Sequence, residues 1–283
     1  ISQSLAIKAL EDKVLLFAAL AFCQDGDEIL HANHGFEMYS IVSKVVGAVP
    51  IKIKEDVNFN LNIENLIDQT NDATKVIYIA SPNNPTGTYL SRDQLVKLMN
   101  SISKNIIVVI DGAYVEYVQK DDYDKGFSLT DEYENIILTR TFSKTYGLAA
   151  LRVGWCYTSQ KIADIINKIK PPFNTTTISQ SLAIKALEDK EHIENSVKLN
   201  SEIKDWFEKE LKLLNIKTRQ TEGNFTLIET SEEEAEKISN HLMNDGIIIR
   251  RLNSYNLPNF LRISIGTKEE MDLTVESLKK FNV

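Results

Sequence analysis

The stretch NIIVVIDGAY, residues 105–114, contains five consecutive Ile and Val residues followed directly by an aspartate. A β-branched run without polar alternation is typical of a strand that is covered on both faces, as in a parallel sheet flanked by helices. KVIYIA at 75–80 and NIILTR at 135–140 have a similar character. Together the three runs predict an open α/β sheet over about residues 14–189.

The segments around these runs have the patterns of helices and further strands. Helical spacing of apolar residues predicts helices at 14–23, 36–48, 62–70 and 91–102. Ser91 is the expected N-cap of the last of them. Shorter apolar runs predict two more strands, at 28–32 and 49–53. This alternation predicts a three-layer, mostly parallel sheet with helices on both faces.

The sequence beyond residue 170 predicts a second, smaller unit. Pro171 and Pro172 interrupt the helical pattern, and a long charged helix is expected at about 191–214. Residues 215–283 then read as strand, helix, strand, strand and helix, which predicts a small α+β domain. We therefore predict a large domain at 14–190 and a small C-terminal domain at 191–283.

Composition excludes several classes of function. The 283 residues carry a formal net charge of −8, which argues against a nucleic-acid partner because phosphate binding needs a basic surface. The sequence has no apolar run of membrane-spanning length and no secretory signal pattern at its N-terminus. With two cysteines and four histidines, neither a disulfide framework nor a metal-ligand spacing is present. We expect a cytoplasmic protein without a metal site.

Polar side chains follow the three apolar runs at the points where the strands should end. Ligands of open α/β sheets bind at the carboxyl ends of the strands, so these side chains should meet in one crevice. Each has an ordinary explanation when taken alone: a turn, a helix cap or a solvated lysine. The residues concerned are Asn83 and Asn84 after the first run, Asp111 and Tyr114 after the second, and Thr141, Ser143 and Lys144 after the third.

Taken together, these groups match the requirements of pyridoxal phosphate chemistry. The aldehyde of this cofactor needs a lysine amine, its ring nitrogen needs an acid, and its phosphate needs hydroxyls and a cation. Arg152, eight residues after Lys144 across a segment of mostly small and apolar residues, supplies a cation. An aromatic side chain should also cover the face of the ring. The sequence therefore predicts a pyridoxal phosphate site.

At this level of detail the chain resembles the histidinol-phosphate aminotransferase branch of the fold type I, aspartate aminotransferase-like enzymes. The resemblance covers about residue 14 to the C-terminus and rests on the order and spacing of several motifs. The HGFEMY motif normally begins with proline in that family, and here His34 stands in this stretch. The motifs are HGFEMY at 34–39, SPNNPTG at 81–87, DGAYVEY at 111–117, TFSKTYGLAALRVG at 141–154 and LRISIGT at 261–267.

The resemblance implies a role for each matching residue. Lys144 would bond to the cofactor aldehyde and move a proton at the substrate Cα, and Asp111 would keep the ring nitrogen protonated. Tyr114 would bind the 3-oxygen of the ring. The remaining expected contacts are Asn84 to the 3-oxygen, Phe36 to the ring face, Thr141, Ser143 and Arg152 to the phosphate, and Arg262 to an acidic group of the substrate.

The same resemblance implies a homodimeric aminotransferase of histidine biosynthesis. It would act on histidinol phosphate or imidazole-acetol phosphate, with glutamate and 2-oxoglutarate as the other pair. Three alternatives remain open: an aromatic amino acid aminotransferase, a phosphothreonine-type decarboxylase that shares this scaffold, and a catalytically impaired remnant that still binds the cofactor.

One feature departs from the family pattern. ISQSLAIKALEDK occurs twice without change, at 1–13 and at 178–190. Family members carry roughly eighty further residues before the position of Val14, a length that one domain accommodates. That segment normally supplies a substrate-binding strand, a tyrosine that reaches the partner subunit's cofactor, and a glycine–serine phosphate loop. We expect residues 1–13 to be the product of a junction rather than part of the original fold.

Overall fold

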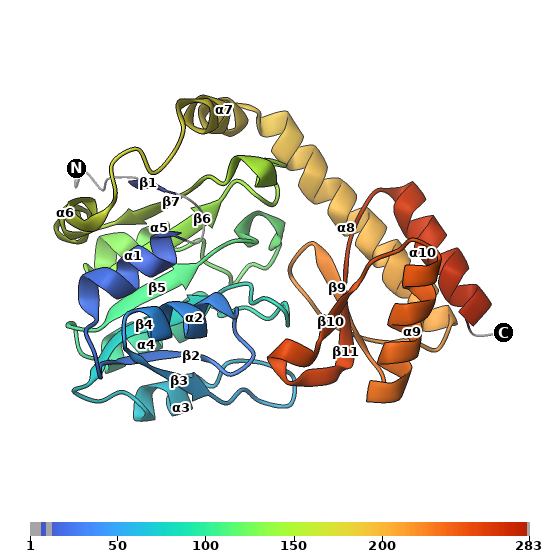
Figure 1. Ribbon diagram of the computed structural model, residues 1–283, viewed down its shortest axis with the longest axis horizontal. Coiled ribbons are helices and arrows are strands. Elements are labelled where there is room, and N and C mark those ends of the chain that lie inside the picture. The colour runs from blue at the N-terminus through green and yellow to red at the C-terminus, as the bar shows by residue number, and fades with distance from the viewer. Residues whose placement is uncertain (1–6, 10–12, 282–283) are drawn as a thin grey trace.

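The structure, a computed structural model, describes residues 7–9 and 13–281 and contains two β-sheets joined by a long helix (Figure 1). The larger sheet has seven strands in the order β1-β7-β6-β5-β4-β2-β3. These strands are β1 (Ile7–Ala9), β2 (Glu28–Ala32), β3 (Val49–Ile53), β4 (Thr74–Ala80), β5 (Ile107–Asp111), β6 (Ile136–Thr141) and β7 (Gly154–Thr158).

Most of the large sheet is parallel, as the sequence predicted. Strands β2 to β6 pair in parallel, whereas β7 is antiparallel to β6 and β1 is antiparallel to β7. The sequence did not predict β7, because GWCYT begins with glycine and alternates between buried and half-buried positions instead of forming an apolar run. The buried runs mark the centre of the sheet and not the strands that extend it.

Helices cover both faces of the large sheet, which explains the apolar runs. On one face α1 (Lys13–Phe22), α2 (Met38–Val45) and α6 (Gln160–Ile169) form a core with strand residues such as Val76 and Val109. On the other face α3 (Ile63–Asp68), α4 (Arg92–Ser101) and α5 (Phe127–Glu132) pack on residues such as Ile77 and Val108. Consecutive strand residues therefore enter opposite cores, and both must be apolar.

The smaller sheet is antiparallel, with the strand order β10-β11-β9-β8. Its strands are β8 (Lys217–Arg219), β9 (Phe225–Glu229), β10 (Arg250–Leu252) and β11 (Leu257–Ser264). One face packs on α8 (Lys190–Leu213), α9 (Glu232–Asn244) and α10 (Lys268–Phe281) through an apolar core. The short polar strand β8 was not predicted. The other elements have the order expected for this part of the sequence.

Helix α8 runs from α7 (Thr177–Glu188) to the smaller sheet and is the connection between the two sheets (Figure 1). We propose that the boundary between the domains lies near residue 190, where α8 begins. The duplicated sequence adopts two conformations: Ile-Lys-Ala is a strand paired with β7 at 7–9 and is helical within α7 at 184–186. The rest of the first copy up to residue 12 lies outside the described residues, and its expected origin stays a prediction.

Two negative findings concern the described part of the chain. No helix within residues 7–9 and 13–281 is long and apolar enough to cross a membrane. Among the same residues, no group of three or more His, Cys, Asp or Glu side chains is arranged to hold a metal ion.

The contact between the two units predicts the effect of a substitution at Gly87. This residue has φ +76°, and a Cβ placed on it would lie 2.4 Å from Thr221 Cβ. Gly246 has a similar φ of +81°, but no described atom lies within 4 Å of an added Cβ. We expect Gly246→Ala to lower the free energy of unfolding by about 1 kcal/mol through backbone strain. Gly87→Ala should cost about 1–3 kcal/mol more, because Thr221 must also move.

Urea unfolding of both variants and the unchanged chain measures this difference. Equal losses for the two variants would contradict the close approach of Thr221 to the loop that contains Gly87.

Candidate active site

The predicted strand ends converge on one pocket at the carboxyl edge of β4, β5 and β6. The pocket has about 580 Å³ of empty volume, counting the part that opens to solvent. Of the predicted site residues, it is lined by Phe36, Asn84, Asp111, Tyr114, Thr141 and Lys144. Side chains from three separate strand ends therefore share one cavity, as expected for the edge of a parallel sheet.

Asp111 is the last residue of β5, and both of its carboxylate oxygens accept hydrogen bonds. Tyr39 Oη donates to Oδ2 at 2.9 Å, and Thr139 Oγ1 donates to Oδ1 at 2.9 Å. Neither Tyr39 nor Thr139 was predicted from the sequence to have a function. The signals were present, since Tyr39 ends the HGFEMY motif and Thr139 interrupts the apolar run of β6. Only the fold brings the two hydroxyls to the same carboxylate.

Lys144 lies in the tight turn that follows β6. Its Nζ is 5.3 Å from the centre of the Tyr114 ring, so the amine and the phenol share the pocket. The turn is held locally, because the Ser143 amide donates to Thr141 Oγ1 at 2.9 Å and the Gly147 amide donates to the Lys144 carbonyl at 2.9 Å. These bonds order the backbone on both sides of the lysine.

Arg152 and Ser143 lie together beside the Lys144 turn and do not line the pocket itself. Arg152 Nη1 donates to Ser143 Oγ at 3.3 Å and to the Ala149 carbonyl at 3.0 Å. Arg152 is exposed and has φ +48°, an unusual backbone conformation for a residue with a side chain. Thr141 itself is buried and lines the pocket, so two hydroxyls and a guanidinium lie together at and beside it, a group that suits an anion.

Arg262 comes from β11 of the smaller sheet and reaches the same edge. Its Nη1 donates to Asn84 Oδ1, and its guanidinium carbon lies 5.0 Å from the centre of the Phe225 ring. Its Nε is buried and has no hydrogen-bond partner among the described residues. A buried guanidinium NH without a partner is costly, and an acidic ligand would provide an acceptor.

The segment that carries Phe36 is held in place by polar contacts with other elements. The His34 amide donates to Glu55 Oε1 at 2.8 Å, and His34 Nδ1 lies 3.1 Å from Glu55 Oε2. Asn83 Nδ2 donates to the His34 carbonyl at 3.1 Å. These contacts of His34 anchor the segment that carries Phe36.

Arg140 is a buried charged residue that lines the pocket. Arg140 donates to the carbonyls of Thr139 and Lys125, and a Cβ on Gly112 would lie 2.2 Å from its Nη1. Burial lowers the pKa of Arg140 and raises the pKa of Glu116. The guanidinium thus lies directly under the turn that follows Asp111, where only glycine leaves room for it.

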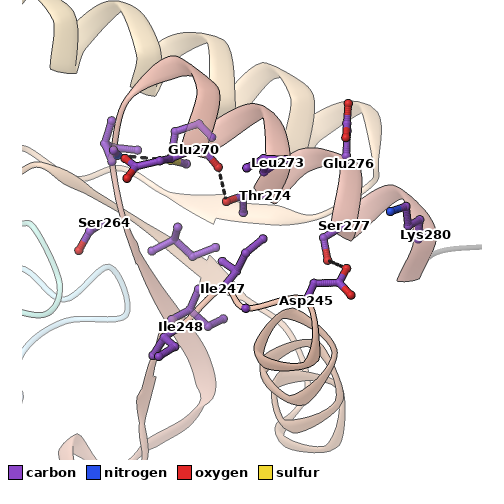
Figure 2. Close-up of a pocket in the computed structure, with 16 residues that line it drawn as sticks. Asp245, Ile247, Ile248, Ser264, Glu270, Leu273, Thr274, Glu276, Ser277 and Lys280 are labelled. Atoms are coloured by element: carbon purple, nitrogen blue, oxygen red, sulfur yellow. Dashed lines mark hydrogen bonds between the residues drawn. The ribbon is translucent and has the colours of Figure 1, made fainter.

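Another pocket lies in the smaller unit, between α10 and the segment that precedes β10 (Figure 2). Ile247, Ile248 and Leu273 contribute apolar surface to it. Two polar side chains on its wall have partners, since Ser277 Oγ donates to Asp245 Oδ2 at 2.7 Å and Thr274 Oγ1 donates to a helix carbonyl at 2.9 Å. None of the predicted site residues, all of which the structure describes, lines this pocket. It carries no argument for a second active site.

A lysine amine, a supported carboxylate and a phenol at the strand ends of a three-layer α/β sheet are the groups that a pyridoxal phosphate-dependent enzyme needs. The chain belongs to the aminotransferase class I and II family, whose model matches residues 12–278.

Curated relatives carry a more specific name than the family. The chain is 40% identical over 264 residues to a histidinol-phosphate aminotransferase of Pelagibacter ubique. This match covers 92% of the chain and 73% of that protein. It is 35% identical over 269 residues to the enzyme of that name from Rhodospirillum centenum, with 94% and 74% covered. The chain thus spans about three quarters of the length of these relatives.

A solved structure agrees with the fold. The crystal structure of histidinol-phosphate aminotransferase from Sinorhizobium meliloti in complex with pyridoxal-5'-phosphate matches with a TM-score of 0.90 and 23% identity. The match covers 98% of this chain and 77% of that one. At this identity it shows the shared architecture, and the predicted fold class is confirmed.

Proposed function

We propose that this chain is a pyridoxal phosphate-dependent aminotransferase of histidine biosynthesis. It would transfer the amino group of histidinol phosphate to 2-oxoglutarate, which gives imidazole-acetol phosphate and glutamate, or catalyse the same reaction in reverse. The observation that carries the proposal is the shared pocket of Lys144, Asp111 and Tyr114 at the carboxyl edge of the sheet. The names of the relatives at 35–40% identity support the choice of substrate.

The side chains around the pocket fit the cofactor by their chemistry. A carboxylate with two hydrogen-bond donors suits a protonated ring nitrogen, and the Phe36 ring suits the face of the cofactor. Asn84 Oδ1 already accepts from Arg262, so the amide has its NH₂ group to offer to the 3-oxygen together with the Tyr114 hydroxyl. The hydroxyls and guanidinium that suit the phosphate are those of Thr141, Ser143 and Arg152.

In the proposed reaction the residues of the chain hold and move protons. Pyridoxal phosphate, when bound, supplies the reactive aldehyde and an electron-accepting ring. Asp111 would keep a proton on the ring nitrogen. Lys144 Nζ would hold the cofactor aldehyde and, once the substrate amine has displaced it, would act as the base at the substrate Cα. The Tyr114 hydroxyl would orient the ring.

Two arginines of the smaller sheet support a substrate with an anionic end. Arg250 of β10 lies directly opposite Arg262 of β11, so both side chains leave the sheet on the same face. Arg262 contacts Asn84, and Arg250 Nη2 lies 3.7 Å from Glu37 Oε2 next to the Phe36 segment. Two guanidiniums side by side suit a phosphate better than an uncharged aromatic side chain. Arg262 was predicted from the sequence as a substrate-binding residue, and Arg250 was not.

The test is a half-reaction assay with histidinol phosphate, phenylalanine, tyrosine and glutamate. The absorbance of the bound cofactor reports the extent of each reaction. We expect the highest kcat/KM with histidinol phosphate. Arg250→Gln should lower it about 10-fold to 100-fold, since a hydrogen bond to a charged group is lost, and should change the phenylalanine reaction little. Arg251→Gln is the matched control, because its side chain leaves the same strand on the opposite face.

Each other outcome contradicts a specific part of the proposal. Preference for phenylalanine or tyrosine would indicate an aromatic aminotransferase. Release of carbon dioxide without a keto acid would indicate the decarboxylase. A bound cofactor that reacts with none of the amines would indicate an inactive remnant.

We also propose that the chain forms a homodimer in the cytoplasm. Helix α7 supports the dimer, because it exposes apolar side chains that a second copy could cover. These are Ile178, Leu182, Ile184 and Leu187, which lie on both sides of the buried part of the helix, with exposed fractions of 69%, 44%, 47% and 48%. A stable dimer needs such an apolar interface. The sparse cysteine content of the chain is consistent with a reducing compartment.

A further inference from the structure

Building on the proposed function, we infer that Tyr39 is a positioning residue of the reaction: with Thr139 it holds Asp111 as an oriented carboxylate toward the cofactor nitrogen. Tyr39, at the end of the HGFEMY segment, would then have a role separate from that of Phe36, which would cover the ring. This role depends on contacts within the chain and not on which amino acid is the substrate.

Hydrogen bonds hold the Asp111 carboxylate from two sides. Tyr39 approaches Oδ2 from α2, and Thr139 approaches Oδ1 from β6, each at 2.9 Å. Because the donors come from different elements, the plane of the carboxylate cannot rotate without breaking one of the bonds. A carboxylate oxygen accepts more than one hydrogen bond, so this support is compatible with a further bond to a ligand.

Packing fixes the direction of the Tyr39 hydroxyl. The side chain is 1% exposed, and its ring stacks on Tyr78 with a centroid distance of 4.9 Å and an angle of 2°. Phe36 contacts the same ring edge-on at 5.9 Å. Other titratable groups that surround it are His31 on β2 and Tyr255 on η3 (Asn253–Tyr255). A ring packed in this way has no other position from which to reach Asp111.

The electrostatic setting keeps the hydroxyl as a donor. Burial, followed by the nearby charge of Asp111, raises the pKa of Tyr39 well above its ordinary value. Tyr39 therefore stays protonated at any pH at which the enzyme works. Hydrogen bonds to the charged form of an acid favour that form. The hydrogen bonds from Tyr39 and Thr139 thus favour the charged form of Asp111, so that the proton would remain on the cofactor nitrogen.

Removal of the Tyr39 hydroxyl should alter this proton balance and leave the packing intact. We expect Tyr39→Phe to lower kcat about 10-fold or more, because one hydrogen bond to a charged group is lost. Asp111 would then draw the proton away from the cofactor nitrogen. The ring then carries less positive charge, so the nitrogen that links Lys144 to the cofactor holds its own proton more tightly. The pH midpoint of the colour change of the lysine-linked cofactor should therefore move upward.

Tyr78→Phe is the matched control. Tyr78 is the stacked partner of Tyr39, is also 1% exposed, and donates its hydroxyl to the Leu15 carbonyl at 2.7 Å. Its loss removes one buried hydroxyl from the same pair of rings without touching Asp111. It should lower thermal stability and leave the pH midpoint of the cofactor unchanged.

The experiment is a spectrophotometric pH titration of the purified holoprotein and its variants, with kcat measured in parallel. Thr139→Val should shift the midpoint in the same direction and serves as the second probe if Tyr39→Phe does not fold. Equal midpoints for Tyr39→Phe, Thr139→Val and the unchanged chain would overturn the inference. Failure of the unchanged chain to form the coloured lysine-linked cofactor would instead overturn the proposed function.

Discussion

Replacement of Lys144 by alanine should remove both the covalent hold on the cofactor and the base that acts at the substrate Cα. We expect amino transfer to fall by about 10²–10⁴-fold, the range for loss of a positioned acid–base group. The visible absorbance of the lysine-linked cofactor should disappear as well. The reason is local: Lys144 is the one lysine among the residues that line the site pocket. Single-turnover assays and absorbance spectra of the purified variant measure both effects.

Lys161→Ala is the control for this substitution. Lys161 is exposed on α6, remote from the strand ends that form the pocket, and its loss should change neither spectrum nor rate. A small primary amine added to Lys144→Ala should restore part of the proton transfer, because it supplies the missing base. An unchanged spectrum in Lys144→Ala would place the covalent attachment at another lysine and contradict the proposed site.

Asp111→Asn should cause the second largest loss. The substitution conserves shape but removes the charge that holds the proton on the cofactor nitrogen. It also turns an NH₂ group toward either the Tyr39 or the Thr139 hydroxyl, each of which donates to Asp111. Removal of one member of a buried charge pair costs about 3–5 kcal/mol, or roughly 10²–10³-fold or more in rate. We expect a loss of this size in kcat.

The measurement compares kcat and cofactor affinity for Asp111→Asn and for Asp131→Asn, which alters an exposed aspartate on α5. Only the first should lose activity, and Asp111→Glu should fail to restore it because a longer side chain displaces the carboxylate from its two donors. A variant Asp111→Asn with unchanged turnover would show that the acid at the end of β5 does not act on the cofactor.

The stretch that begins with residue 105 predicted the class of fold, because a strand buried on both faces needs an unbroken apolar run. The structure bears this out, since consecutive residues of β5 enter the two cores on opposite faces of the sheet. The strands with weaker patterns were missed. β7 carries polar and half-buried positions, and β8 is polar and short. Neither contains an unbroken apolar run of the kind that predicted the central strands.

The grouping of the residues around Lys144 could be predicted from the sequence for a related reason. Ser143, Lys144 and Arg152 lie in one short segment between β6 and β7. Asp111 and Tyr114 are three positions apart, so in both cases the spacing in the sequence was enough to predict that the residues lie together. The partners of these groups are distant in sequence. Tyr39 reaches Asp111 across 72 positions, and Arg262 reaches Asn84 across 178.

The sequence by itself determined the class of sheet, the buried strands at its centre and the chemical groups placed at their ends. These are properties of short segments, set by side-chain periodicity and by turns that need particular residues. Only the tertiary structure decided which hydroxyls support Asp111 and that Arg250 lies beside Arg262. Such pairings depend on how helices pack on the sheet and on strand register, and a shift of one residue in register would turn Arg250 to the opposite face.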